Sequence, residues 1–406
     1  MPPLDPRPPR AISPLRVGAC TLTWAGAQGR AATLAALRAR RTGLRVNDFG
    51  SSPVSTYVGR VAGLDTTPLP QRFAEWDCRT NRLAWLALQQ DDFIDAVTSA
   101  RLHYGAERIA VVLGTFGSSI GASEQAYQHL ELDGQFPVML RRPIVHEPHS
   151  SADFVQHALG LRGVCVTVAT ACSSSAKAFA QAERIIHAGL ADAAVVGGVD
   201  TLSGSALFGF DALGLLSREP CRPFDAERKG MSLGEGAGFA LLESSAGPGP
   251  WLIGYGESSD AYHMCAPHPK GTGLHLVLRE ALARGRCRAD QVDYVNLNGT
   301  ASLDSDEVEA RVIQEVFPER TLASSTKGWT GHTRGAAGAV ESIISLLALD
   351  AQFVPGTLNT SKLDAACGPQ IQIDNREAHL LFALNLSFGF GGSHCALLFG
   401  RERTPG

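Results

Sequence analysis

The sequence lacks the features that mark several specialised classes of protein. No apolar run approaches the roughly 20 residues that a membrane helix needs, and runs such as 239–242 end in charge or glycine. Charge of one sign is not in excess, since 36 lysine and arginine residues face 40 aspartate and glutamate residues, for a net charge of -4. These absences argue against a membrane protein and against nucleic-acid binding as the main task.

The cysteines show no paired spacing. They are odd in number, widely scattered, and form no Cys-x-x-Cys motif and no cysteine–histidine ligand pattern. The nine are Cys20, Cys78, Cys165, Cys172, Cys221, Cys265, Cys287, Cys367 and Cys395. Free thiols in a reducing cytoplasm are the simpler interpretation. The proline-rich start of the chain also lacks the apolar core of a signal peptide, so we expect a cytoplasmic protein.

Glycine and short apolar runs dominate what is present. With 406 residues, 44% of them hydrophobic, the chain is long enough for two domains or one large doubled fold. Apolar runs at 109–113, 193–196 and 396–399 precede glycines and predict buried strands that end in tight turns. Small-residue segments at 174–189 and 335–349 have helical spacing. The alternation predicts an α/β protein whose sheets are covered by helices.

Two parts of the chain follow a similar order of elements. Residues 164–200 and 322–392 each predict a strand, a polar turn and a small-residue helix. From spacing alone, chance similarity between helices rich in alanine and glycine is as good an explanation as duplication. A Gly/Pro/Ser stretch at 244–250 is the expected seam. The predicted parts are a proline-rich lead-in over residues 1–15, an N-terminal half over residues 16–245 and a C-terminal half over residues 251–406.

Three polar turns that follow predicted strands carry reactive groups. Cys172 stands just before a predicted helix, where free amides and the positive end of the helix dipole lower a thiol pKa. Asn298 follows a second strand, and Lys327 and His332 follow a third. Active sites of α/β folds collect at strand ends, so these groups can form one site. Taken singly, the cysteine is more often a buried structural thiol. For each of the other three, an ordinary loop or turn residue is as good an interpretation as a functional one.

Five motifs occur in a fixed order along nearly the whole chain. They are Thr170-Ala171-Cys172-Ser173-Ser174-Ser175, Asn296-Leu297-Asn298-Gly299-Thr300, Lys327-Gly328-Trp329-Thr330-Gly331-His332, Gly335-Ala336-Ala337-Gly338 and Asn385-Leu386-Ser387-Phe388-Gly389-Phe390-Gly391-Gly392. With them, the chain resembles the β-ketoacyl-acyl carrier protein synthases of the elongating type, in the thiolase-like condensing enzyme superfamily. The resemblance implies a thiolase-like α/β fold, with two duplicated halves stacked as five layers α-β-α-β-α.

The resemblance also implies an activity. Cys172 would take an acyl chain from the phosphopantetheine arm of acyl carrier protein and condense it with malonyl-carrier protein, with loss of carbon dioxide. Such a reaction serves fatty-acid, polyene or polyketide biosynthesis. The backbone amides of Cys172 and Phe390 would form the oxyanion hole. Phe390 would also gate the acyl pocket, with Gly389 and Gly391 letting its loop move.

The same resemblance extends to supporting residues and partners. His332 matches a histidine that contacts the malonyl thioester, while Lys327 and Glu341 match a supporting lysine and glutamate. Thr300 and Ser302 fall where two hydroxyls bind the pantetheine arm, with serine in place of the second threonine. The enzyme itself would use no metal and no cofactor, because the carrier protein brings the phosphopantetheine. Expected partners are acyl carrier protein and a second subunit, in a homodimer or a ketosynthase-type heterodimer.

Asn298 departs from the family pattern, because it stands where the elongating enzymes carry their first catalytic histidine. An amide can donate a hydrogen bond to an enolate oxygen but cannot exchange a proton near neutral pH. The chain could therefore be an active enzyme, a condensation-deficient acyltransferase that only holds a thioester, or a form with an engineered substitution. A non-catalytic partner subunit is a further alternative, against which the retained Cys172 argues.

Two further clusters have simple interpretations. His263, Cys265 and His268 share a proline-containing loop but lack a fourth ligand, so no metal site is expected there. The arginines within 38–41 lie near the end of a predicted surface helix. They predict a solvated face or, alternatively, a dock for an acidic carrier protein.

Overall fold

The computed structural model describes residues 10–50, 53–245 and 247–403. Within these ranges, eleven strands form one mixed sheet in the order β12-β11-β15-β16-β10-β1-β9-β7-β5-β6, with β2 (Ala27–Gln28) paired to β1. The strands of the first half are β1 (Leu15–Trp24), β5 (Ile109–Gly114), β6 (Cys165–Val168), β7 (Ala193–Asp200) and β9 (Gly236–Glu243). Those of the second half are β10 (Trp251–Ser259), β11 (Tyr294–Asn296), β12 (Leu322–Ser324), β15 (Phe382–Gly389) and β16 (Ser393–Gly400).

The two halves share one topology. From the centre outwards the first half runs β1-β9-β7-β5-β6 and the second β10-β16-β15-β11-β12, so each follows its own first, fifth, fourth, second and third strand. The halves meet where β1 pairs antiparallel with β10, through Leu15 with Leu252 and Arg16 with Trp251. The predicted duplication is confirmed by this shared order. Of the predicted lead-in, residues 1–9 lie outside the described residues, and the division at 245 and 251 stays a prediction.

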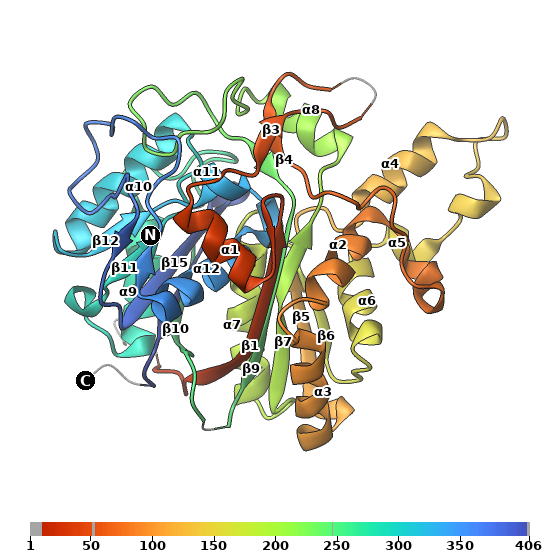
Figure 1. Ribbon diagram of the computed structural model, residues 1–406, viewed down its shortest axis with the longest axis horizontal. Helices are drawn as coiled ribbons and strands as arrows, with labels where there is room; N and C mark the ends of the chain where they lie inside the picture. Colours follow the sequence, from red (N-terminus) through yellow and green to blue (C-terminus); the bar gives the residue numbers. More distant parts are fainter. Residues whose placement is uncertain (1–9, 51–52, 246, 404–406) are drawn as a thin grey trace.

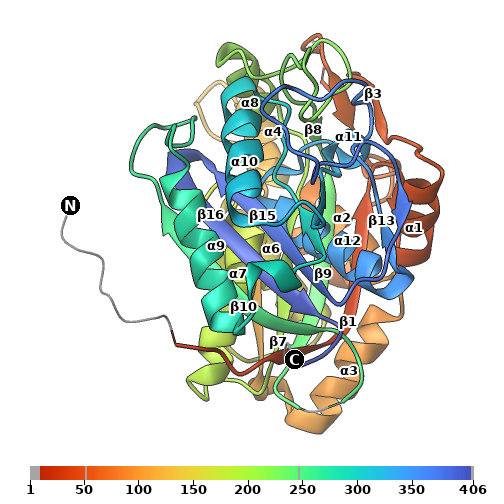
Figure 2. The ribbon, with the colours of Figure 1, turned by 90° about the vertical axis from the view of Figure 1, so that its left-hand side faces the viewer.

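Helices separate and cover the two halves of the sheet, as Figures 1 and 2 show. The central helices α7 (Ser174–His187) and α12 (Ala337–Ala351) contact each other and strands of both halves. The first half is covered on its outer face by α2 (Arg79–Leu88), α3 (Phe93–Tyr104) and α6 (Ser150–Ala158). The second half is covered by α9 (Thr272–Gly285), on which α10 (Leu303–Val316) packs. The predicted α-β-α-β-α layers are confirmed.

Small side chains allow the two central helices to lie this close. Every residue of α12 from Ala337 to Leu349 is buried, and nearly all of them are apolar, with Glu341 the one charged exception. A Cβ atom on Gly338 would lie 2.5 Å from the backbone nitrogen of Ala176 on α7, so only glycine fits there. The alanine and glycine content of both segments is therefore a packing requirement.

Two sequence predictions need correction. Gly197 and Gly198 do not end their strand, because β7 continues to Asp200. A Cβ atom on Gly197 would lie 2.0 Å from the carbonyl oxygen of Gly238 on the neighbouring strand, so the glycine serves close packing instead of a turn. The helix predicted at 335–349 begins at Ala337, because Arg334–Ala336 forms a short 3-10 turn before it.

Shorter elements surround this core. The helices are α1 (Arg30–Arg38), α4 (Ile120–Gln128), α5 (Pro143–His146), α8 (Gly204–Ala212) and α11 (Lys327–Thr330). The strands are β2 (Ala27–Gln28), β3 (Leu44–Val46), β4 (Tyr57–Gly59), β8 (Leu233–Gly234), β13 (Phe353–Val354) and β14 (Arg376–Glu377). In the basic cluster of α1, Arg38 pairs with Glu377, and Arg40 pairs with Asp374. In the described part of the chain, no helix is long and apolar enough to cross a membrane.

Candidate active site

A cavity of about 50 Å³ lies where the polar turns of the two halves meet. It is small enough to hold only a few water molecules. The residues that line it include seven predicted from the sequence, namely Cys172, Asn298, Thr300, Ser302, His332, Gly389 and Phe390. The structure therefore brings together residues that come from four separate segments of the chain. Two other predicted residues, Lys327 and Glu341, do not line the cavity.

Cys172 is presented by a sharp turn between β6 and α7. Ala171 has a left-handed backbone, with φ of 54°, which reverses the chain directly before the thiol. The Ser174 hydroxyl accepts a hydrogen bond from the Thr170 amide at 2.9 Å and closes the turn. Because α7 begins at Ser174, Cys172 lies against the positive end of that helix. The predicted placement of the cysteine at a strand end and a helix start is what the structure shows.

The Cys172 thiol is buried, with 3% of its surface exposed. The thiol pKa is raised and not lowered as the helix start predicts, because burial raises the pKa of Cys172 to about 12 and outweighs the positive charges of Lys327 and Arg334. The side chain is therefore a neutral thiol in the unliganded protein at neutral pH. Its proton has to leave when sulfur attacks an acyl group.

The side-chain amide of Asn298 has a defined orientation. Its Oδ1 atom accepts a hydrogen bond from the backbone N–H of Phe388 at 3.1 Å. Because an N–H group needs an acceptor, the oxygen must face Phe388, and the Nδ2 group remains free to donate. Asn298 lines the cavity, so it offers a neutral N–H donor to whatever binds there.

Lys327 acts on this turn from behind. Its Nζ group donates to the backbone carbonyl of Asn298 and to Oε1 of Glu341, each at 2.5 Å. Both charged side chains are only 1% exposed, so they form a buried ion pair. Lys327 was predicted to be catalytic, but it is not among the residues that line the cavity. Its contacts are those of a group that positions Asn298.

Two buried carboxyl groups that the sequence analysis missed also hold this turn. Glu309 accepts hydrogen bonds from the N–H groups of Asn298 and Gly299, at 2.7 and 2.8 Å. Asp306, one turn earlier on α10, accepts from Ala301. The sequence does contain a sign of this arrangement, because the two acidic residues stand three positions apart on the helix that follows the motif at 296–300 and therefore share one face of it. Burial raises the pKa of Glu309 to about 8 and that of Asp306 to about 6.

The raised pKa of Glu309 makes a pH-dependent contribution to stability. Because the folded-state pKa of about 8 lies above the ordinary value of 4.5, the protonated carboxyl favours the folded state. This contribution is complete below about pH 4.5 and is lost as pH rises to about 8. Relative to Glu309→Gln, we expect wild-type stability to fall by on the order of 1 kcal/mol per pH unit across this window.

Chemical unfolding at several pH values measures this effect. The slope with pH is the readout, because glutamine also loses one of the two N–H contacts and lowers stability at every pH. Glu307→Gln, on an exposed position of the same helix, is the matched control and should keep the wild-type slope. Equal slopes for wild type and Glu309→Gln would show that this carboxyl does not titrate in the folded protein as argued.

His332 is held by its backbone and has a free ring nitrogen. Its N–H donates to the carbonyl of Ser232 at 2.7 Å, and its carbonyl accepts from Gly234 at 3.0 Å. Burial, together with the charges of Lys327 and Arg334, lowers the pKa of His332 well below its ordinary value. The imidazole is therefore neutral. Its Nδ1 atom is buried and has no hydrogen-bond partner among the described residues.

The loop at Phe390 touches the turn that carries Cys172. The Phe390 ring stacks on Phe210 of α8, with centroids 5.3 Å apart and planes at 23°. Gly391 has φ of 78°, a conformation that favours glycine. Glycine is required at position 389 for lack of space, because a Cβ atom there would lie 2.6 Å from the carbonyl oxygen of Thr170. The loop is thus held close to the thiol turn.

A hydrogen-bonded pair of side chains behind this loop was also missed by the sequence analysis. His394 Nε2 lies 2.8 Å from Asp260 Oδ2, and both side chains are buried. Burial raises the pKa of Asp260, but the hydrogen bond from His394 and two backbone N–H groups outweigh it and lower the pKa overall. The neighbouring Cys265 lines the cavity, while His268 donates its backbone N–H to Asp260. In the described residues, no three His, Cys, Asp or Glu side chains converge on a metal position.

Thr300 and Ser302 stand together at the cavity wall. The Thr300 hydroxyl donates to the Ser302 hydroxyl at 3.2 Å, and both residues line the cavity. The exchange of threonine for serine therefore keeps an oxygen at the second position. The pair presents two hydroxyl groups to a ligand that enters here.

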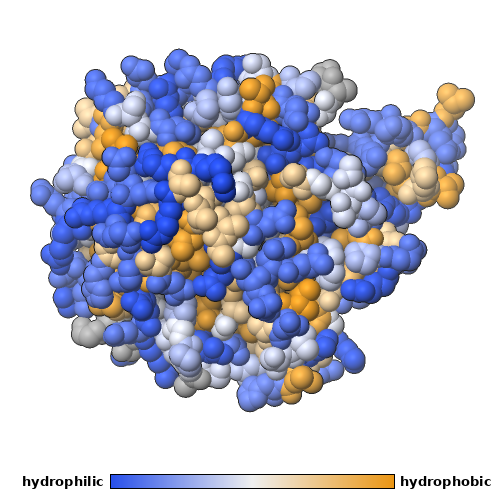
Figure 3. Space-filling view, in the orientation of Figure 1, coloured by the Kyte–Doolittle hydropathy of each residue, from blue (hydrophilic) through white to orange (hydrophobic). Residues whose placement is uncertain are grey.

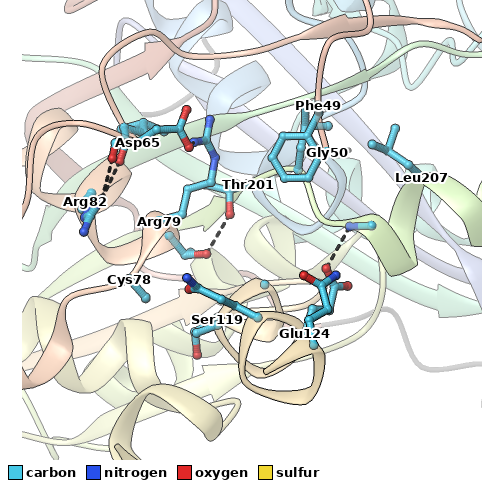
Figure 4. Close-up of a pocket in the computed structure, with 18 of the residues that line it drawn as sticks. Phe49, Gly50, Asp65, Cys78, Arg79, Arg82, Ser119, Glu124, Thr201 and Leu207 are labelled. Carbon is cyan, nitrogen blue, oxygen red and sulfur yellow. Dashed lines mark hydrogen bonds and ion pairs between the residues drawn. The ribbon is translucent and has the colours of Figure 1, made fainter. Parts of the chain in front are cut away.

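A second and larger cavity, of about 690 Å³, lies apart from these residues (Figure 4). It is bounded by the start of α2, by α4 and by the start of α8, and none of the predicted site residues lines it. Its charged side chains are engaged: Arg79 binds Glu235, and Glu124 accepts from the amides of Gly204 and Ser205. The reactive groups of the chain therefore gather at the smaller cavity.

Comparison with known proteins identifies the family of this chain. Residues 82–246 match the family model "Beta-ketoacyl synthase, N-terminal domain", and residues 251–361 match "Beta-ketoacyl synthase, C-terminal domain". The chain belongs to the β-ketoacyl synthase family. It is 32% identical to 3-oxoacyl-[acyl-carrier-protein] synthase 2 of Vibrio cholerae, over 83% of this chain and 90% of that protein. It is 33% identical to nodulation protein E of Rhizobium leguminosarum bv. trifolii, over 72% of this chain and 76% of that protein.

Solved structures of ketosynthases have the same fold. The ketosynthase ApeO, solved in complex with its chain length factor ApeC from Xenorhabdus doucetiae, superimposes with a TM-score of 0.86 and 32% identity. That match covers 96% of this chain and 98% of the other. A β-ketoacyl synthase from Burkholderia phymatum gives a TM-score of 0.83 at 26% identity, over 96% of this chain and all of the other. The thiolase-like fold expected for this β-ketoacyl synthase is confirmed.

Proposed function

We propose that this β-ketoacyl synthase binds an acyl group as a thioester on Cys172 and condenses it with malonyl-carrier protein. The observation that carries the proposal is the shared cavity, where a thiol at a helix start faces Asn298 and His332. A nucleophile and two neutral donors in one enclosed site suit acyl transfer followed by stabilisation of a developing enolate. The phosphopantetheine belongs to the carrier protein, so the chain itself supplies only side chains and amides.

The first step is transfer of the acyl group. The Cys172 sulfur attacks the carbonyl carbon of the acyl-pantetheine thioester, the new S–C bond forms, and the pantetheine sulfur leaves with a proton. The family forms its oxyanion hole from the amides of the nucleophile and of the gate phenylalanine. Here the close contact of Gly389 with Thr170 holds the Phe390 and Cys172 turns together. Thr300 and Ser302 lie at the wall of the cavity, where their hydroxyls can bind the pantetheine arm.

The second step is loss of carbon dioxide from the malonyl thioester. The electrons of the broken C–C bond move toward the thioester oxygen, so donors placed at that oxygen lower the barrier. Asn298 Nδ2 and the imidazole of His332 are the neutral donors of the cavity. The enolate carbon then attacks the acyl group on Cys172, and the cysteine sulfur leaves.

A second subunit is the proposed partner. Strand β6 is an edge strand, and its valines Val166 and Val168 are half-exposed. The projection that carries α4 and α5 has gathered hydrophobic side chains, which Figure 3 shows in orange. Leu132, Val138 and Met139 there are at least 75% exposed. An open sheet edge and an apolar projection are features that a protein partner covers.

A related ketosynthase structure indicates which kind of second subunit to expect. The ApeO ketosynthase was solved with a chain length factor, and at 32% identity it supports a heterodimer of that type. A homodimer is the alternative. Size measurement of the purified chain alone distinguishes them, since a homodimer forms without a second gene product.

The mass of the intact protein after incubation with acyl- and malonyl-carrier protein tests the proposed function. We expect an acylated form with acyl-carrier protein alone, and its loss together with formation of 3-oxoacyl-carrier protein when malonyl-carrier protein is added. If the chain requires a chain length factor, the same assay is run on the co-purified complex. An unmodified mass in both cases would overturn the proposal.

A second candidate function is favoured by Asn298. Without a proton-exchanging histidine at this position, the chain could hold and pass on an acyl group without condensing it. The same experiment distinguishes this alternative. A stable acyl-enzyme that does not react when malonyl-carrier protein is added would establish the thioester holder in place of the condensing enzyme.

A further inference from the structure

Arg334 is a buried cation that the proposed mechanism does not use. Its side chain is 1% exposed and stands two positions after His332, at the entry to α12. Among the described residues it makes one hydrogen bond, from Nη2 to the carbonyl oxygen of Thr201, and one ring contact. Its Nε atom is buried without a partner. A guanidinium that is nine-tenths buried and keeps a free N–H costs stability unless a ligand satisfies it.

Aromatic rings connect this guanidinium to the gate. Phe390 stacks on Phe210, and Phe210 lies edge-on to Phe116 with centroids 6.0 Å apart. The guanidinium carbon of Arg334 lies 5.9 Å from the centre of the Phe116 ring. The order from the cavity is thus Phe390, Phe210, Phe116 and Arg334. The positive charge of Arg334 also acts on the Cys172 thiol and lowers its pKa, against the larger effect of burial.

An acyl chain on Cys172 needs more room than the cavity beside the thiol offers. The cavity beside the thiol, at about 50 Å³, has room for a few water molecules and not for a chain of several carbons. A chain that displaces the Phe390 ring from Phe210 comes next to Phe210, then Phe116 and then Arg334, in the order of their contacts.

A buried carboxyl group already interacts with Arg334. Asp200 is buried and interacts electrostatically with Arg334, while its own oxygens accept from the Thr115 hydroxyl and from the amides of Phe116 and Gly117. A further carboxylate would add an uncompensated negative charge in this apolar region. What the guanidinium lacks is a hydrogen-bond acceptor. A neutral oxygen, such as a hydroxyl or a carbonyl, meets that need without a change of net charge.

We infer that Arg334 selects acyl groups that carry a neutral oxygen along the chain, in preference to plain alkyl chains. The inference rests on the proposed acylation of Cys172 and names the class of acyl group for that site. Flat or unsaturated segments suit the aromatic rings between the gate and the guanidinium. The oxygen accepts a hydrogen bond from the free N–H group of Arg334. Arg334 is thus a specificity residue of the acyl path.

Loading of Cys172 from paired acyl groups of equal size tests this inference. Each ω-hydroxyacyl group is compared with the alkyl group in which methyl replaces hydroxyl, such as 6-hydroxyhexanoyl with heptanoyl, over a series of chain lengths. A hydrogen bond to a buried charged donor should favour the hydroxyl member by on the order of tenfold at one length of the series. For Arg334→Leu we expect the opposite preference, because an apolar side chain then faces the oxygen. Arg334→Lys keeps a donor and should keep the sign of the wild-type preference.

The outcomes separate this inference from the proposed function. Wild-type preference for the alkyl member at every length would overturn the inference, as would an unchanged ratio in Arg334→Leu. In both cases Cys172 is still loaded, so the proposed function stands. No loading of Cys172 by either member overturns the proposed function itself. Arg162→Leu, at an exposed arginine on the protein surface, is the control and should keep the wild-type ratio. The wild-type comparison needs no variant, so a folding defect in Arg334→Leu does not prevent the test.

Discussion

Replacement of Cys172 by alanine is expected to abolish acylation and condensation together. Of the nine cysteines, only this one combines the strand end, the start of α7 and the cavity that holds Asn298 and His332. Loss of the nucleophile in covalent catalysis removes on the order of 10⁴-fold in rate or more. Intact mass and peptide mapping after incubation with acyl-carrier protein measure the effect.

Two other cysteines provide the comparison for this result. Cys165→Ala removes a half-exposed thiol on β6 and is expected to leave the acylated peptide unchanged. Cys265 lines the same cavity as Cys172, so it is the thiol that could be acylated in place of Cys172. An acyl group on Cys265 or Cys165, or one that persists in Cys172→Ala, would contradict the proposed mechanism.

Substitution of Asn298 by histidine is expected to raise condensation with little effect on acylation. A histidine ring nitrogen can accept from the Phe388 N–H as Asn298 Oδ1 now does, which leaves the other ring N–H directed at the cavity. Loss of one oxyanion donor costs about 10²–10³ in rate, so exchange of a weaker for a stronger donor should gain less, on the order of tenfold. Rates of 3-oxoacyl-carrier protein formation and of single-turnover acylation separate the two steps.

The alanine variant at the same position completes this test. Asn298→Ala removes the donor and is expected to lower condensation by on the order of 10²-fold, while acyl transfer to Cys172 survives. If Asn298→His lowers condensation and Asn298→Ala abolishes it, then asparagine is the native, tuned donor. That result would also dismiss the thioester-holder alternative, because condensation would then depend on Asn298.

Much of the fold could be predicted because its patterns are local. Apolar runs bounded by glycine marked β5 and β16, and the small-residue segments marked α7 and α12. Both helices are buried between two sheets, and only side chains as small as alanine and glycine let backbones approach so closely. The glycines in β7 show the limit of this reasoning. Their use depends on the strand opposite them, and a local pattern cannot distinguish a turn from close packing.

For the site, too, some features could be predicted from local sequence and others depend on the tertiary structure. The sequence by itself determined which groups are reactive: a thiol before a helix, and an amide and an imidazole in polar turns. Only the tertiary structure decided that Lys327 lies behind the cavity, that Glu309 and Asp306 hold the Asn298 turn, and that Arg334 is buried against Phe116. Those roles depend on burial and on partners that lie far away along the chain. Charged side chains look alike in a sequence, and only the packing around them decides which are solvated and which are held inside.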